Sequence, residues 1–290
     1  MTPAGQSGRM ANVKESFEHA ALADKLGFAA LWARDVPLMV PQGSDNKAVA
    51  LDDPFLWLAG LAMSTKNIAL GAAAIVVPLR HPLHVAKAAL SLDRLSGGRF
   101  ILGLGSGDRP AEYDAFGKDL EARRAVFHDS WPLLRSALSP VADERRLLLE
   151  ATAGYDLMEA PQARVPMMVV GSARQSVQWI AQNSDAWITY HRVESRQQGR
   201  INLWRQALSE RAGGAYKPFV QSLDLQLLES PTASSEPLEL GLRTGRNQLI
   251  EYLGRLKGLG VGHVIVHLSN KGRPISDMIR EIGEEVLPRI

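Results

Sequence analysis

The chain has 290 residues, of which 46% are hydrophobic and 22% are charged, and its formal net charge is +2. Its basic and acidic residues are interleaved, with no basic run containing aromatics, and the longest strongly apolar run, residues 72–78, is far shorter than the roughly 20 residues that span a bilayer. The absence of cysteine excludes disulfides, thiolate nucleophiles and cysteine-ligated metals. We therefore expect a cytoplasmic protein that binds neither nucleic acid nor membrane.

Short apolar runs alternate along the chain with amphipathic segments, the pattern of strands alternating with helices. Asn12 is expected to cap a first helix that Gly27 ends. Asp53-Pro54 and Pro82 are expected to open the second and third helices, because Pro is tolerated at the first helical position. Strands are expected at residues 28–33, 68–77, 99–105, 165–170, 185–190, 219–228 and 263–268. Later helices are expected at about 119–138 and 172–183, around 201–208, from about 249 to Gly258, and from 275 onward.

Strict alternation of strands and helices predicts an α/β fold with parallel strands and right-handed crossovers. Seven or eight such units fit a closed (β/α)8 barrel of the TIM type better than a doubly wound sheet. No Pro/Gly/Ser-rich linker or charge run divides the chain, so we expect a single domain over residues 1–290. The least regular stretches, 37–51, 140–164 and 229–243, are expected to be specificity loops.

The segment before the first helix has no strand pattern. Residues 1–11 contain no run of β-branched or apolar side chains, so a loop is predicted there. An eight-stranded barrel needs a strand at this place, and we therefore expect the first strand to be truncated or missing and the native N-terminus to be longer. Loss of one strand would leave two strand edges unpaired and open the core to water.

The sequence GLGSG at Gly103–Gly107 invites comparison with a dinucleotide-binding loop. That loop runs directly into a helix and has an acidic residue about 20 positions later. Here Pro110 stands where the helix should begin, and position 123 is Arg. We therefore interpret the segment as a glycine-rich strand end, where small residues let a ligand approach the backbone. Ser106 does not lie in a Gly-x-Ser-x-Gly elbow, so hydrolase chemistry is not supported.

Other polar positions near strand ends allow more than one interpretation. His81 and His84 have a spacing found in metal sites, but no acidic third ligand is evident, so a capping or packing role is favoured and no metal is expected. Asp35 either belongs to a site at the carboxyl end of its strand or forms a solvated pair with its neighbour Arg34. Ser172 either binds phosphate at a helix N-terminus, together with Gly171, or simply caps that helix.

Three segments together resemble the luciferase-like monooxygenases, the barrel family of bacterial luciferase and its flavin- or deazaflavin-dependent relatives. They are ADKLGFAALWARD, IALGAAAIVVPLRHPLHVAKAALSLDRLSGGRFILGLGSG and MMVVGSARQSVQWIAQNSDAWITY. The middle segment is the most specific, since it joins a small-residue strand, His-Pro, an alanine-rich helix and Ser-Gly-Gly-Arg-Phe. The resemblance covers about residues 11–287.

The resemblance implies a flavin at the carboxyl end of the barrel. The cofactor contacts that it implies are Ala73, Ala74, Ser106, Gly107, Gly171, Ser172 and Gln175. A cis peptide between the two alanines would lie against the ring, and the segment from Gly171 to Gln175 would bind the phosphate. Asp35 matches an acidic residue near the ring, and Asp35 and Arg109 are the candidate catalytic groups. Val36 stands where bacterial luciferase has a histidine, so light emission is not expected.

The family implies an FMN-dependent oxidoreductase or monooxygenase that uses O2 to oxidise a small organic substrate. Two alternatives stay open: hydride transfer with the deazaflavin F420, and a flavin-binding barrel without turnover. A separate flavin reductase is a possible partner. We also expect a homodimer through the helices beside the second and third strands. The stripes around Trp57 and Leu61, and around Ala88 and Leu92, look too apolar for single-sided burial, and family members commonly pair this way.

Overall fold

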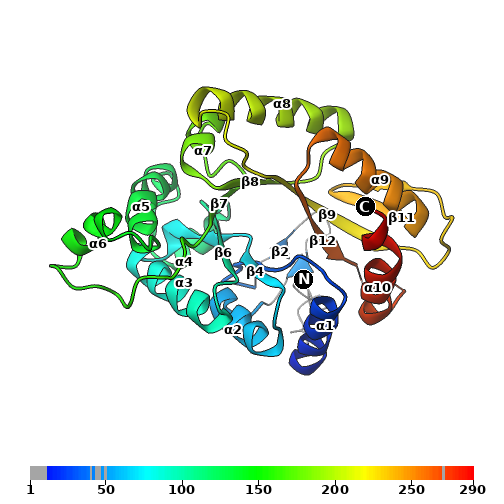
Figure 1. Ribbon diagram of the computed structural model, residues 1–290, viewed down its shortest axis with the longest axis horizontal. Helices are drawn as coiled ribbons and strands as arrows, with labels where there is room; N and C mark the ends of the chain where they lie inside the picture. The colour runs from blue at the N-terminus through cyan, green and yellow to red at the C-terminus, as the bar shows by residue number, and fades with distance from the viewer. Residues whose placement is uncertain (1–11, 40, 43–46, 49–50, 270–271) are drawn as a thin grey trace.

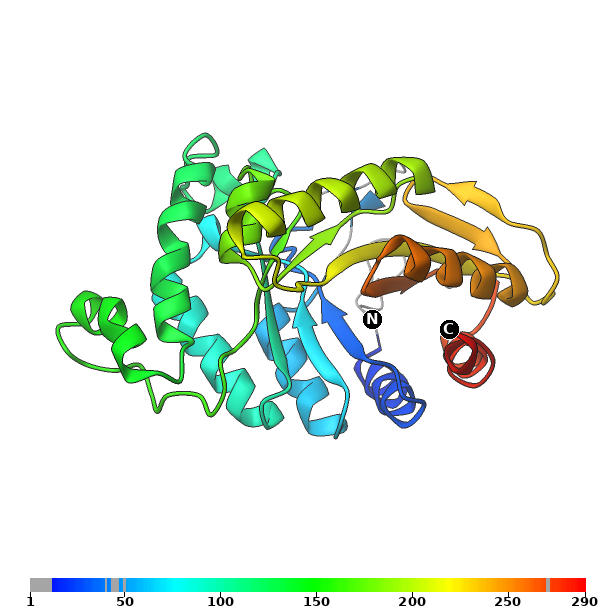
Figure 2. The same ribbon diagram turned by 45° about the horizontal axis from the view of Figure 1, so that its top comes forward.

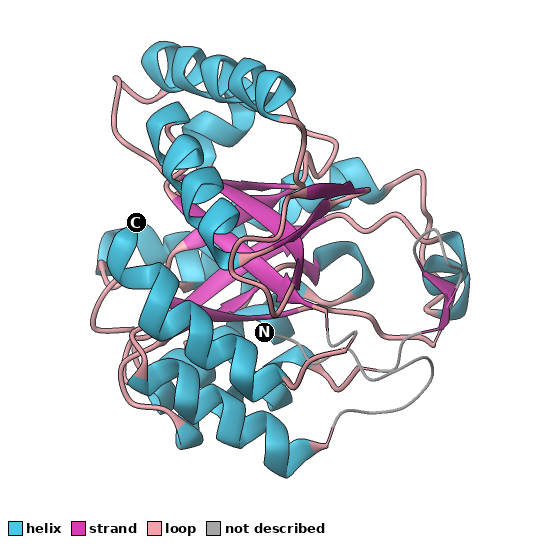
Figure 3. Ribbon diagram, turned by 90° about the vertical axis from the view of Figure 1, so that its right-hand side faces the viewer, coloured by secondary structure: helices cyan, strands magenta, loops and turns pink. Residues whose placement is uncertain are grey.

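Parallel strands lie at the centre of the molecule and helices surround them (Figure 1, Figure 3). The computed structural model describes residues 12–39, 41–42, 47–48, 51–269 and 272–290. The main ladder contains, in chain order, β1 (Ala30–Ala33), β4 (Ala69–Ala72), β6 (Phe100–Gly105), β7 (Met167–Val170), β8 (Ala186–Thr189), β9 (Phe219–Leu227) and β12 (His263–Leu268). Each strand pairs in parallel with the next, as the alternating pattern predicts. The α/β prediction is therefore confirmed.

The first three long helices begin at the capping residues that the sequence predicts. They are α1 (Val13–Lys25), α2 (Pro54–Ser64), α3 (Pro82–Ser96), α4 (Pro110–Ala115), α5 (Arg123–Ala137), α6 (Arg146–Ala151), α7 (Val177–Asn183), α8 (Glu194–Arg211), α9 (Arg246–Leu259) and α10 (Ile275–Glu281). Asn12 accepts a hydrogen bond from the Glu15 amide at 3.3 Å, and Asp53 accepts one from the Phe55 amide at 2.9 Å. His81 Nδ1 accepts from the Leu83 amide at 3.2 Å, which confirms its capping role. Short 3-10 turns, at Val77–Leu79, Ala142–Arg145 and Leu287–Arg289, and a π-turn at Ile282–Val286 complete the helical segments.

Several elements differ from the sequence-based expectation. The strand expected at 68–77 is interrupted after Ala72 and resumes as β5 (Ile75–Val76), which pairs with the end of β6. Pro110 does begin a helix, the short α4, and α9 ends at Gly260 rather than Gly258. Two hairpins occupy expected loops: β2 (Pro41–Gln42) with β3 (Lys47–Ala48), and β10 (Glu236–Leu238) with β11 (Gly241–Thr244). The second hairpin extends the edge of β9 (Figure 2).

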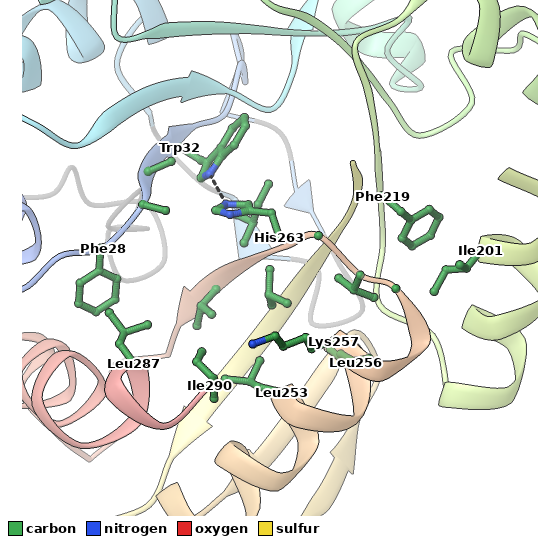
Figure 4. A pocket seen from close by; sticks show the side chains of 18 of the residues that line it. Phe28, Trp32, Ile201, Phe219, Leu253, Leu256, Lys257, His263, Leu287 and Ile290 are labelled. Atoms are coloured by element: carbon green, nitrogen blue, oxygen red, sulfur yellow. Dashed lines mark hydrogen bonds between the residues drawn. The ribbon is translucent and has the colours of Figure 1, made fainter. Parts of the chain in front are cut away.

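The ladder is not closed between β1 and β12 within the described residues. A side-chain hydrogen bond crosses the seam instead, because Trp32 Nε1 donates to His263 Nε2 at 3.2 Å (Figure 4). The surrounding helices do meet here, since α1 packs against α10 (Figure 1). The prediction that residues 1–11 form a loop in place of a first strand lies outside the described residues.

An apolar cavity of about 760 Å³ lies at this seam (Figure 4). Its walls come from β1, β12, α8 and α9, and from the C-terminal segment that includes Leu287 and Ile290. Most of β12 is only half-buried, whereas strands of a closed parallel barrel are buried on both faces. None of the flavin contacts implied by the sequence lines this cavity, so it is distinct from the site described below.

Candidate active site

The residues predicted to form a site all follow strands, and they lie along one edge of the ladder. Because the strands are parallel, their carboxyl ends meet at the same edge. We call this edge the mouth and define it by residues 34–36, 73–74, 106–109, 171–175 and 190–192. Among the described residues, no group of three or more potential metal ligands comes together, at the mouth or elsewhere.

The peptide bond between Ala73 and Ala74 is cis, as predicted. Its position is fixed on one side by β1, because the Ala73 amide donates to the Ala33 carbonyl at 2.7 Å. On the other side lies β6, whose glycines leave no room for larger residues. A Cβ on Gly103 would lie 2.0 Å from the Ala72 carbonyl oxygen, and a Cβ on Gly105 would lie 3.1 Å from the Ala74 Cβ. This part of the mouth is therefore built from backbone and methyl groups.

Asp35 is 6% exposed and both of its carboxylate oxygens are engaged. Oδ2 accepts from the Val76 amide at 3.0 Å and from Arg80 Nε at 3.1 Å, while Oδ1 accepts from Arg80 Nη2 at 2.9 Å. Arg80 Nη2 also donates to Asp53 at 3.0 Å. Burial alone would lower the pKa of Arg80, but the bonds to the two carboxylates raise it overall. Asp35 therefore holds the segment that follows the cis peptide.

Arg109 is paired with a carboxyl group one helical turn away. Its Nη1 lies 2.9 Å from Oε1 of Glu112, whose side chain is fully buried. Burial raises the pKa of Glu112, although Arg109 opposes this shift. In the same helix, Tyr113 donates a hydrogen bond to the Ser106 carbonyl, and burial raises the pKa of Tyr113 to about 12. The helix α4 thus fixes the strand end that carries Ser106.

The turn after β7 has an unusual backbone. Gly171, Ala173 and Arg174 have φ angles of 66°, 44° and 58°, in the left-handed region that residues other than glycine seldom adopt. Such conformations turn backbone N–H groups toward a common side and are found in anion-binding loops. They also cost energy and tend to persist where function requires them. The turn is therefore a candidate phosphate cradle.

The helix behind this turn begins later than the sequence suggests. Its cap is Ser176, which accepts from the Trp179 amide at 3.2 Å, and not Ser172. Ser172 instead accepts from the Arg174 amide at 3.1 Å and stabilises the turn. The Gln175 side chain donates to the Ala173 carbonyl and to a carbonyl of α5, both at 3.1 Å. The expected junction of Gly-Ser with a helix was therefore wrong, because residues 173–176 separate Ser172 from the first residue of α7.

The opposite side of the mouth carries polar residues that sequence reasoning did not select. His267 Nδ1 lies 3.3 Å from Asp224 Oδ1, and the two residues are register partners on β12 and β9. Arg34 is largely buried, and burial together with the nearby Arg109 lowers its pKa, while Asp224 acts in the opposite direction. His191 follows β8 and is 7% exposed. Arg34 and His191 directly follow predicted strands, which was the available signal, whereas Asp224 and His267 lie within predicted strands.

Residues 1–230 match the family model of the luciferase-like monooxygenases. The match covers more than half of the chain, so the chain belongs to this family of oxidoreductases.

Two characterised relatives illustrate the range of the family. A 4-hydroxyprotoasukamycin monooxygenase from Streptomyces nodosus is 35% identical over 104 residues, which are 35% of this chain and 26% of that protein. An F420-dependent hydroxymycolic acid dehydrogenase from Mycobacterium tuberculosis is 31% identical over 178 residues, which are 60% of this chain and 48% of that protein. The chain thus matches less than half of the length of either relative.

A solved structure shows the same fold over nearly the whole chain. The oxygenating constituent of 3,6-diketocamphane monooxygenase from Pseudomonas putida, in complex with FMN, superimposes with a TM-score of 0.74. The superposition covers 100% of this chain and 97% of that chain at 16% sequence identity. Neighbours of this kind identify the fold as that of the TIM-barrel monooxygenases.

The helices of the described segments include none long and apolar enough to cross a membrane.

Proposed function

We propose that this protein is an FMN-dependent monooxygenase that oxidises a small organic substrate with O2. The observation that carries the proposal is the cis peptide at Ala73-Ala74, set between β1 and the glycine-bearing end of β6. A flat surface without large side chains suits the face of a planar ring. The bound flavin would supply the redox chemistry, and the protein would bind it, orient it and exclude water.

Each predicted contact has a role that fits its surroundings. The turn at 171–174 would hold the phosphate with its backbone amides, and Gln175 would fix that turn to α5. Ser106 and Gly107 would bound the ring on the side of β6, where Tyr113 holds the Ser106 carbonyl. Asp35 would act through Arg80 and Val76 by positioning the cis-peptide segment. Arg109, paired with Glu112, would contribute positive charge near the cofactor.

The second candidate is hydride transfer with F420, which the name of the mycobacterial relative supports. A visible spectrum of the purified, cofactor-loaded protein separates the two, because oxidised FMN has two bands and F420 has one dominant band with strong fluorescence. A non-catalytic flavin-binding barrel is the third candidate. Consumption of reduced flavin that increases when substrate is added would exclude it. FMN-loaded protein with no such consumption, across a broad substrate panel, would contradict the monooxygenase proposal.

The phosphate cradle makes a direct prediction. Ser172→Asp places a negative charge in the turn, where it repels a bound phosphate, so the dissociation constant for FMN should rise by about tenfold or more. Fluorescence titration of apoprotein with FMN measures it. Ser195→Asp, which adds the same charge on the exposed surface of α8, is the matched control. Equal FMN affinity in both variants would reject the cradle.

We further propose a homodimer that uses α2 and α3. Trp57, Leu61 and Leu92 are buried within the chain, so the apolar stripe that suggested pairing already has partners. However, Leu56 and Met63 on α2 remain 76% and 77% exposed, and they offer an apolar surface for a second copy. Light scattering should give twice the chain mass of 31.7 kDa, and Leu56→Glu with Met63→Glu should give the monomer mass. A monomer in the unmodified protein would contradict the proposal.

A further inference from the structure

A network of buried polar side chains lies behind the mouth, between β8, β9 and the helices α8 and α9. Its members are His191, Gln197, Gln221 and Tyr252, none of which is more than 7% exposed. Gln197 comes from α8, Gln221 from β9 and Tyr252 from α9. Burial of so many polar groups is unfavourable unless their hydrogen bonds are made. Four buried polar side chains in contact therefore suggest a functional role.

The hydrogen bonds of the network follow one donor-to-acceptor order, which starts at Gln197. The Gln197 amide nitrogen lies 2.7 Å from Gln221 Oε1, and within 3.5 Å of the Tyr190 carbonyl and 3.4 Å of Thr189 Oγ1. A backbone carbonyl can only accept, and the Thr189 hydroxyl donates to the Val220 carbonyl. Three acceptors on one side of Gln197 favour its nitrogen as the donor to Gln221 Oε1, which turns the nitrogen of Gln221 to the other side. In this orientation Gln197 Oε1 is enclosed without a hydrogen-bond partner.

The same donor-to-acceptor order leads from Gln221 to the imidazole of His191. Gln221 Nε2 donates to the Tyr252 hydroxyl at 2.9 Å and lies 3.4 Å from His191 Nδ1. The Tyr252 hydroxyl, which accepts from Gln221, lies 3.1 Å from the same Nδ1 and can donate to it. Both neighbours of Nδ1 are thus donors, so Nδ1 is the acceptor. In a neutral imidazole the proton then resides on Nε2.

The imidazole is kept neutral by its surroundings. Burial, followed by the neighbouring positive charge of Arg192, lowers the pKa of His191, while Asp224 acts in the opposite direction. Asp224 lies on the inner face of the strands, because alternation along β9 places it with Val220, which packs against Trp32 and Ile188 inside the ladder. His191 is therefore within electrostatic reach of the interior side of the mouth.

The second ring nitrogen faces away from the network. Nδ1 is directed toward Gln221 and Tyr252 on the helix side, and the two nitrogens of an imidazole point in divergent directions. Within the described part of the chain, Nε2 makes no hydrogen bond, and it is not one of the enclosed polar atoms that lack a partner. Solvent therefore reaches Nε2, and because His191 belongs to the mouth residues 190–192, we place the incoming acceptor there.

We propose that His191 is a substrate-binding residue whose Nε2–H donates to an oxygen acceptor, of the carbonyl class, on the bound substrate. Gln197, Gln221 and Tyr252 are positioning residues that fix its tautomer. The substrate assignment rests on the proposed function, whereas the tautomer does not. The network thus selects ketones, aldehydes and related compounds over hydrocarbons of the same shape.

The first experiment tests the tautomer in the full chain. Long-range ¹H–¹⁵N spectra of histidine-labelled protein, with His191 assigned by comparison with His191→Gln, should show the proton on Nε2. The double variant Tyr252→Phe, Gln221→Leu removes both donors to Nδ1 and should shift the population toward the Nδ1–H form. The exposed His84 in the same sample should not change. An Nδ1–H tautomer in the unmodified protein would overturn the proposal.

The second experiment tests the acceptor. Cyclohexanone should shift the His191 Nε2–H resonance, and cyclohexane at the same concentration should not. His191→Leu should weaken cyclohexanone binding about fivefold, the size of one net hydrogen bond, as followed by the Tyr190 amide. Equal responses to the two probes would refute the substrate role. An FMN titration of the unmodified protein separates the two proposals, because lack of FMN binding there would count against the proposed function alone.

Discussion

Arg80→Met should lower the free energy of unfolding by about 3 kcal/mol, because removal of one partner leaves a buried charge without compensation. The Asp35 side chain is only 2% exposed, and Arg80 supplies two of its three hydrogen bonds. The same change frees the segment between the cis peptide and α3, so FMN affinity should fall as well. Urea denaturation of the apoprotein measures the first effect and FMN titration the second.

Two further variants identify the cause. Asp35→Asn combined with Arg80→Met removes both charges and should recover a large part of the lost stability. Arg255→Met removes an arginine whose pair with Glu194 is roughly half exposed, and it should cost no more than about 1 kcal/mol. If Arg80→Met proved no more harmful than Arg255→Met, the Asp35 carboxylate would not depend on Arg80 in the way described here.

The order of the strands was predictable because each strand is a short apolar run bounded by turn residues. Helix capping was also predictable from neighbouring residues, since the side chains of Asn12, Asp53 and His81 accept hydrogen bonds from amides two or three residues away. The cis peptide was not evident from the residues alone and came only from the resemblance to the family. Local residue patterns and the resemblance to the family together thus located the mouth and the cis peptide that forms part of it.

The remaining features depend on residues that are distant in sequence. Asp35 and Arg80 are separated by 45 positions, and no spacing rule connects them. The polar network brings Gln197 and Gln221 to His191 from two different elements, which no local pattern indicates. The left-handed conformations of Ala173 and Arg174 were also hidden, because neither residue type favours them. The helix α4 was missed because Pro110 was used as an argument against a helix beginning there, although Pro is accepted at the first position.

Gly103→Ala should lower the stability of the protein more than any other substitution that adds a single methyl group next to the mouth. The new Cβ would lie 2.0 Å from the Ala72 carbonyl oxygen, and this neighbour is backbone, which cannot rotate aside as a side chain can. Relief requires β4 and β6 to separate immediately before the cis peptide. Overpacking of this kind costs typically about 1–3 kcal/mol, and a backbone clash belongs at the upper end of that range.

Gly199→Ala is the matched control, since it adds the same methyl group where no atom lies within 4 Å, on the exposed side of α8. Alanine is the better helix former by about 1 kcal/mol, so this variant should be at least as stable as the parent. Gly103→Ala should instead unfold at lower urea and bind FMN more weakly, because the shifted backbone is the surface proposed for the ring. If stability fell but FMN affinity did not, the glycine would serve only the packing of the strands. The flavin ring would then have to lie elsewhere along the mouth.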